Sequence, residues 1–190
     1  FERLSRLMAE VFGLSISEGA IANILARAET PLAAAAEAIA AAVRTSPVVG
    51  SDETSARVRG KTWWQWVLLS STAICHVIAE TRAASVVTDF LQGRQPEVWV
   101  ADRYGGQRGH GALRQMCLAH LLRDAQYAIE VGDSGFAAGF RLVLLRAVAI
   151  GKRRAALQDS TLAQYGADLE RRLDRLLAGA EPKQDAARRL

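Results

Sequence analysis

Cysteine is scarce in this chain, and long apolar runs are missing. The two cysteines, Cys75 and Cys117, are too few for the disulfide framework that small secreted proteins use. No hydrophobic run is long enough to span a bilayer, and no signal peptide is visible. We therefore expect a globular protein in the cytoplasm, with no membrane partner.

Lysine is also rare, because 21 of the 24 basic residues are arginine. Guanidinium groups bind phosphate oxygens in a bidentate manner, which suits a nucleic-acid partner. A GC-rich genome gives the same bias, because its codons favour arginine, alanine and glycine. Composition therefore leaves nucleic-acid binding open, while 190 residues, half of them apolar, are enough for one sizeable core.

Two apolar runs each stop at a carboxylate. Residues 47–49 predict a buried strand that ends at Asp52 and Glu53, and residues 63–69 predict the antiparallel strand returning beside it. A further β-rich run stops at Asp102. If the two acid-bearing strands are neighbours in one sheet, about 4.8 Å apart, the aspartates meet.

Adjacent carboxylates repel each other unless a cation lies between them. Mg²⁺ suits a few carboxylates together with substrate phosphates, so the pattern predicts a two-metal site for phosphoryl transfer. Aspartate also ends strands for local reasons, by hydrogen bonding within a turn. The pattern alone leaves both interpretations open.

Four segments occur in one order along the chain: Val48–Thr54 with its DET triplet, Gly60–Val67, Val98–Tyr104 with D-x-Y, and Cys117–Arg123 with C-x-A-H-x-x-R. Together they resemble the central domain of the insertion sequence 66 family of bacterial transposases. The resemblance covers residues 4–127. It departs from the family after Tyr104, where Gly-Gly-Gln replaces the usual continuation of the D-x-Y motif.

The resemblance implies an α/β fold with a ribonuclease H-like mixed sheet, in which three antiparallel strands precede parallel ones. We expect an N-terminal helical segment at 1–45, a partial catalytic core at 46–131 and a helical insertion at 132–190 that is incomplete at its C-terminus. In this fold the first and fourth strands are adjacent, as the two-aspartate hypothesis requires.

The N-terminal segment shows signals for three helices. Apolar spacing predicts helices over 3–12 and 18–28, and Thr30-Pro31 predicts the start of a third that runs to Arg44. The first two have the outline of a helix-turn-helix, but the second offers a DNA groove little beyond Asn23 and Arg27, which favours a structural helical hairpin.

The glycine-rich loop 105–111 does not have the spacing of a dinucleotide-binding fingerprint. A loop that closes over DNA and a solvated surface loop both fit its composition. Cys117 and His120 have the spacing of half a zinc site, but the sequence offers no second pair to complete four ligands.

By the same resemblance, the chain is a DNA transposase fragment that cleaves and joins strands. Asp52 and Asp102 would be its catalytic residues and metal ligands, with Mg²⁺ or Mn²⁺ as cofactor. The implied partners are transposon ends, target DNA and, in the full-length protein, further copies of the chain. Four arginines would contact the nucleic acid: Arg57, Arg59, Arg103 and Arg123.

The family's third acid is a glutamate in an N-N-x-x-E-R segment, which this sequence does not contain. Glu130 and Glu170 fall in helical stretches without that motif. We expect the third acid to lie beyond Leu190 or to be lost, and the isolated chain to be inactive. Two alternatives stay open: a dead transposase remnant that acts as a DNA-binding or interaction module, and a ribonuclease H-like nuclease that cuts without joining.

Overall fold

A computed structural model describes residues 1–133 and 135–179 of the chain. These residues form two compact units. The first consists of Phe1–Trp99 and Gly105–Arg114, and the second of Val100–Tyr104 with the described residues from Gln115 onward. The domain boundaries predicted from the sequence stay a prediction.

Two helices open the first unit. α1 spans Glu2–Phe12 and ends at Gly13, whose φ of 65° lies in the left-handed region that glycine tolerates. α2 spans Glu18–Arg44, and the hydroxyl of its N-cap Ser17 accepts a hydrogen bond from the Ala20 N–H at 3.2 Å. The first predicted helix is therefore confirmed.

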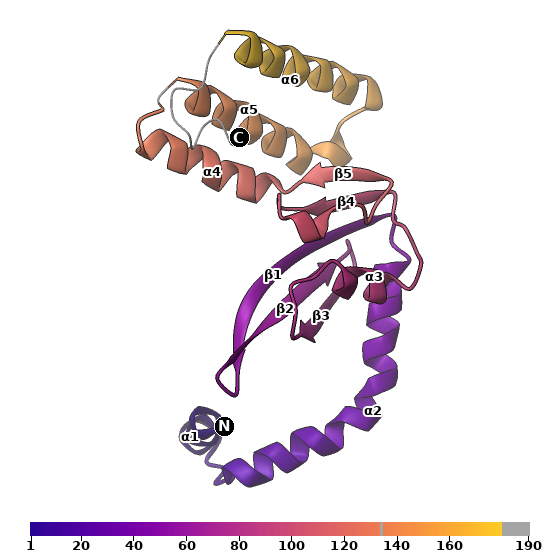
Figure 1. Ribbon diagram of the computed structural model, residues 1–190, viewed down its shortest axis with the longest axis vertical. Coiled ribbons are helices and arrows are strands. Elements are labelled where there is room, and N and C mark those ends of the chain that lie inside the picture. Colours follow the sequence, from indigo (N-terminus) through magenta and orange to yellow (C-terminus); the bar gives the residue numbers. More distant parts are fainter. Residues whose placement is uncertain (134, 180–190) are drawn as a thin grey trace. The chain divides into compact units, whose positions relative to one another are not determined.

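The expectation of separate second and third helices is wrong, because α2 continues through Pro31. A proline in a helix interior lacks the N–H that bonds to the residue four positions earlier, and it commonly kinks the helix. The alanines that follow have the highest helix propensity and favour continuation. Figure 1 shows α2 as one long, bent helix. The segment thus holds two helices rather than three.

Three consecutive strands form the predicted antiparallel meander: β1 at Val48–Val58, β2 at Lys61–Leu69 and β3 at Ile74–Ala79. The β1–β2 turn consists of Arg59 and Gly60, whose φ angles of 48° and 78° are both positive, as the tight turns that match strand twist require.

Asp52 and Glu53 lie in the middle of β1 and not at its end, which corrects the sequence interpretation. β2 pairs with β1 as far as Val58, so the strand continues well beyond the two acids. The hydrophobic run ends early because most residues of β1 beyond Ser51 are exposed, and from Ala56 onward β1 and β2 form a two-stranded ribbon.

The meander has an inner and an outer face, which side chains occupy alternately along each strand. α2 packs against β3, and α3, at Ser85–Leu91, contributes buried side chains on this inner side. The large, fully buried apolar side chains of the first unit are Val43, Val49, Trp66, Leu68, Val87 and Trp99.

Two short strands complete a five-stranded sheet of order β3-β2-β1-β4-β5. β4 spans Val98–Ala101 and β5 spans Leu113–Met116. The Leu113 N–H donates to the Glu97 carbonyl at 2.8 Å and the Cys117 N–H donates to the Ala101 carbonyl at 2.8 Å. Residue numbers therefore increase in the same direction along β4 and β5, which shows that these two strands are parallel. The predicted α/β class, the mixed sheet and the adjacency of the first and fourth strands are confirmed.

The glycine-rich loop 105–111 belongs to the first unit and is partly buried there, so it is not the fully solvated surface loop that was one expectation; closure over DNA stays a prediction. It contains a 3₁₀ turn, η1, at Gly105–Gln107, and both Gln107 and His110 are buried. A Cβ added to Gly111 would lie 2.8 Å from the Trp99 backbone nitrogen, which is too close for any side chain. Glycine at 111 thus allows the loop to approach β4.

The described part of the second unit contains three long helices, of which α5 and α6 fall in the helical insertion predicted from residue 132 onward. α4 spans Leu118–Glu130, α5 spans Phe136–Lys152 and α6 spans Asp159–Gly179, with a 3₁₀ turn, η2, at Arg154–Ala156. α5 packs against both α4 and α6 (Figure 1). The predicted insertion also includes residue 134 and residues 180–190, which lie outside the described part of the chain. Among the described helices, none combines the length and apolar character needed to cross a bilayer.

Candidate functional site

Asp52 lies on the outer face of the meander and is exposed to solvent. Its Oδ1 accepts a hydrogen bond from the Glu53 N–H at 3.0 Å. On the adjacent strand β2 its partner is Val67. The carboxylate is therefore accessible to a ligand from solvent.

Asp102 directly follows β4, as the sequence predicted. Its Oδ1 accepts a hydrogen bond from the Tyr104 N–H at 2.9 Å, the local turn that aspartate commonly makes at a strand end. Asp102 also lines a cavity of about 210 Å³ in the second unit, together with Arg103, His120 and Asp124. The sheet order places β1 beside β4, so the strand that carries Asp52 and the strand that precedes Asp102 are neighbours.

Glu53, the next residue of the DET triplet, lies on the opposite face of β1 from Asp52. Its side chain is 1% exposed, and Arg82 contacts its Oε1 through Nε at 2.8 Å and Nη2 at 2.6 Å. The Arg82 guanidinium also lies 4.8 Å from the centroid of the Trp64 ring, within cation–π range. A buried carboxylate requires such partners, because desolvation alone would strongly disfavour its charge.

Gln107 connects Glu53 to β4. Its Nε2 donates to Glu53 Oε2 at 2.5 Å, and its Oε1 accepts from Trp99 Nε1 at 3.2 Å. Sequence reasoning missed this network. The only signal available was a second acid beside Asp52 in a strand, where alternation places one of two adjacent side chains in the core.

The four predicted nucleic-acid contacts fall in different places. Arg57 and Arg59 are exposed at the tip of the β1–β2 hairpin, where Arg57 Nη1 donates to Thr62 Oγ1 at 3.0 Å. Arg103 forms an ion pair with Asp124, in the cavity that Asp102 lines. Arg123 is exposed on α4, and the ion pairs of the described residues do not include it. The nearby acids have other partners, because Asp124 pairs with Arg103 and Glu130 Oε1 accepts a hydrogen bond from Gln126 Nε2 at 2.9 Å.

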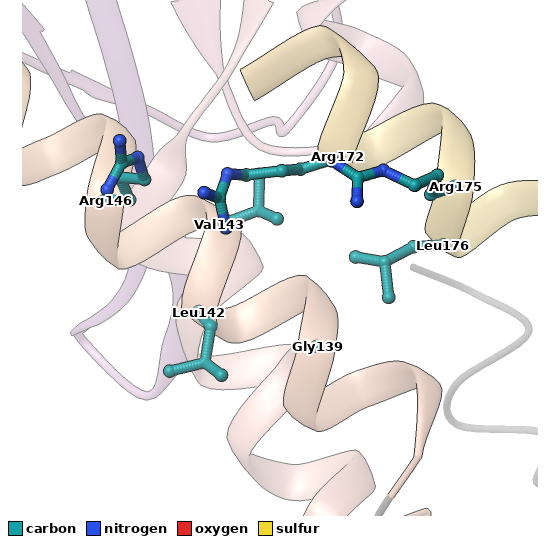
Figure 2. Close-up of a pocket in the computed structure, with 7 residues that line it drawn as sticks. All are labelled: Gly139, Leu142, Val143, Arg146, Arg172, Arg175 and Leu176. Carbon is teal, nitrogen blue, oxygen red and sulfur yellow. The ribbon is translucent and has the colours of Figure 1, made fainter. Parts of the chain in front are cut away.

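A second cavity, of about 320 Å³, lies between α5 and α6. Arg146 extends into it from α5, and Arg172 and Arg175 extend from α6, above Leu142 and Leu176 (Figure 2). This cavity was not anticipated from the sequence, because the mixed charges of α6 fit an ordinary solvated face.

Asp168 joins two arginines of this cavity, Arg146 and Arg172. A hydrogen bond from Arg172 at 2.9 Å lowers the pKa of the Asp168 carboxyl, and the charges of Arg146 and Arg171 act in the same direction. Arg146 Nη2 lies 3.0 Å from Asp168 Oδ2, so this carboxylate links α5 to α6.

In the first unit, burial raises the pKa of the Cys75 thiol, which keeps it in the unreactive protonated form.

Carboxylate oxygens are the available metal ligands. Asp52 and Asp102 offer the hard oxygen donors that Mg²⁺ prefers. Across residues 1–133 and 135–179, no three histidine, cysteine, aspartate or glutamate side chains gather into a group that could hold a metal. Isolated carboxylates of this kind do not fit a closed structural zinc site.

Comparison with known proteins decides the family. The model of the transposase IS66 family matches residues 1–185. The chain belongs to the transposase IS66 family. No curated protein matches the chain at a significant level.

Membership of the IS66 family supports a transposase role and, with it, DNA binding. The match extends over both compact units, and so includes the α5–α6 helices that lie beyond the four sequence motifs. The resemblance that those motifs indicated is thereby confirmed.

Proposed function

We propose that this IS66 family chain supplies Asp52 and Asp102 to a DDE-type catalytic site for DNA strand cleavage and joining, on a ribonuclease H-like sheet. The observation that carries the proposal is the sheet order, in which β1 lies beside β4. A strand bearing one acid and a neighbouring strand followed by another is the arrangement that the fold hypothesis requires.

The proposed roles follow from the surroundings of each residue. Asp52 and Asp102 would hold Mg²⁺ or Mn²⁺, which when bound would polarise the scissile phosphate and lower the pKa of the attacking water or hydroxyl. Glu53 is not assigned to the metal, because both of its carboxylate oxygens already accept hydrogen bonds in the interior. The exposed Arg57 and Arg59 are proposed to bind DNA phosphates.

Metal binding tests the proposal. Titration of the full chain with Mn²⁺ should show weak binding that Asp52→Asn and Asp102→Asn each reduce strongly. The control is Asp89→Asn, which removes an exposed carboxylate from α3 and should leave binding unchanged. Equal effects of all three substitutions would mean that Mn²⁺ binds to general surface charge, and would overturn the proposal.

Strand joining is the second test. Because the chain lacks an N-N-x-x-E-R segment, we propose that it joins no DNA alone. A form of the protein that includes such a segment should join a pre-cut transposon end to target DNA, and Asp52→Asn should abolish the reaction. Cutting without joining would instead identify a nuclease.

A non-catalytic DNA-binding module is the second candidate. It is favoured by the lack of any three-ligand metal group in the described ranges of the chain. It predicts salt-sensitive DNA binding that neither Asp52→Asn nor Asp102→Asn alters, together with no metal dependence.

A further inference from the structure

The outer face of the β1–β2–β3 meander is open. Glu53 and Trp66 form one cross-strand pair on the inner face, whereas Asp52 and Val67 form the next pair on the outer face. On β3 the outer positions are strongly exposed, with Ile74 at 58% and Ile78 at 51%. Within this unit, α2 and Phe90 of α3 lie beside the inner positions Cys75 and Val77 of β3.

Trp63 shares this outer face with Asp52. In the β1–β2 register, Trp63 is opposite Ala56, which lies four residues from Asp52 on β1. Side chains alternate between faces along a strand, so those of Asp52, Ala56 and Trp63 lie on the same face. Trp63 is only half-buried, whereas Trp66 is fully buried on the inner face and Trp64 lies against Arg82. The core therefore does not account for Trp63.

The ribbon that carries Trp63 extends past the rest of the sheet. β3 pairs with β2 only as far as Trp64, and beyond that point β1 and β2 continue as a two-stranded hairpin (Figure 1). Its tip exposes Arg57, Arg59 and Lys61 with no acidic residue between them, which gives a local charge opposite to that of DNA. A two-stranded ribbon is also narrow enough to enter a DNA groove.

We propose that DNA lies along this outer face, and that Trp63 stacks on one of its bases while a phosphate of the same DNA reaches Asp52. The inference rests on the proposed function for the position of the reacting phosphate, and adds a base-binding residue to it. Aromatic stacking tolerates any base, because every base has a π-face, so Trp63 would position the strand without reading its sequence.

The register also gives a distance. On β1, Asp52 and Ala56, the partner of Trp63, are four residues apart. At about 3.3 Å per residue, these two positions are separated by roughly 13 Å along the strand. At about 3.4 Å per nucleotide of one strand, this corresponds to roughly four nucleotides between an unpaired base stacked on Trp63 and the phosphate at Asp52. The stacked base should therefore lie a few nucleotides from the phosphate at Asp52.

Oligonucleotides that carry 2-aminopurine at successive positions test this proposal, because stacking quenches the fluorescence of that base. The full chain should quench the probe at one or two adjacent positions. Trp63→Ala should abolish this quenching and weaken binding about tenfold, and Trp63→Phe should retain most of both. Leu177→Ser, which changes an exposed apolar residue of α6 outside this face, is the control and should leave both unchanged.

Two results would overturn the inference. One is wild-type quenching and affinity in Trp63→Ala. The other is a change of oligomeric state in Trp63→Ala with unchanged DNA binding, which would make the face a protein interface.

Failure of the proposed catalysis is distinguishable, because Asp52→Asn should leave the Trp63-dependent quenching intact. If quenching depends on Trp63 but forms of the protein that include an N-N-x-x-E-R segment join no strands, the base-binding site stands and the catalytic proposal fails.

Discussion

Arg82 contacts a single oxygen of Glu53 through two nitrogens, with Nε at 2.8 Å and Nη2 at 2.6 Å from Oε1. The other oxygen accepts from Gln107. Two adjacent acids of the DET triplet therefore have opposite environments, with Glu53 buried and paired and Asp52 exposed on the other face of β1. Glu53 stabilises the strand that presents Asp52.

Replacing Arg82 should lower the stability of the fold. In Arg82→Met the Glu53 carboxylate stays buried without its cation, and we expect the free energy of unfolding to fall by about 3–5 kcal/mol. Urea denaturation followed by circular dichroism measures the change. Adding Glu53→Gln to Arg82→Met should restore part of the loss, because the uncompensated charge is removed. Arg94→Met, at an exposed arginine of the same unit, is the control and should change stability by less than about 0.5 kcal/mol. An equally small loss of stability in Arg82→Met would contradict the stabilising role assigned to the Arg82–Glu53 ion pair.

Gly111 should not tolerate a side chain. In Gly111→Ala the new Cβ would lie 2.8 Å from Trp99 N and 2.9 Å from the Leu113 carbonyl oxygen, both of which are backbone atoms that move only with their strands. We expect a loss of about 1–3 kcal/mol. The matched variant Gly105→Ala adds a methyl group in open space at the start of the same loop and should be nearly neutral. Thermal unfolding of the two variants provides the test. Equal melting temperatures would contradict the close approach of the loop to β4.

The Asp168 link between α5 and α6 should depend on pH. Because its pKa is lowered in the folded chain, the ionised carboxylate stabilises the fold above the unfolded pKa of about 3.9, and this contribution is lost as pH falls through the folded value. Asp168→Asn should therefore lower the melting temperature at pH 7, and the difference from wild type should shrink at pH 3. The exposed Asp174 on the same helix gives the control substitution Asp174→Asn. A difference independent of pH would show that packing, not charge, explains the effect.

The hairpin tip should contribute to the salt dependence of DNA binding. Each phosphate contact adds about 0.9 to the slope of log K against log salt, so Arg57→Ala with Arg59→Ala should reduce the slope by about 2. Fluorescence anisotropy at several salt concentrations measures it. The pair Arg153→Ala with Arg154→Ala removes two exposed arginines from the second unit. An equal reduction there would show that binding depends on total charge and not on the hairpin.

Much of the secondary structure could be predicted, because its signals are local. The meander, α3, the run ending at Asp102 and α4 to α6 all follow from hydrophobic periodicity and from glycine or proline at their boundaries. Pro31 misled the prediction because proline permits a helix start and also occurs inside a helix when the neighbouring alanines favour continuation.

The candidate site was harder to predict, because its partners are distant in sequence. Asp52 and Asp102 were identified from short motifs, and their roles stay predictions. The environment of Glu53 depends on Arg82 and Gln107, which lie 29 and 54 residues away, and no local pattern pairs them. Strand alternation could have separated the faces of Asp52 and Glu53, had β1 been recognised as longer than its apolar run.

The meander and the glycine-rich loop differ in when they can form. Neighbouring strands of the meander close through short turns, whereas the bond from Gln107 to Glu53 joins residues 54 positions apart. Closing a short segment costs less chain entropy, so local pairings form earlier during folding. The hairpin with Asp52 and Trp63 should therefore form early in folding, before Gln107 packs against Glu53.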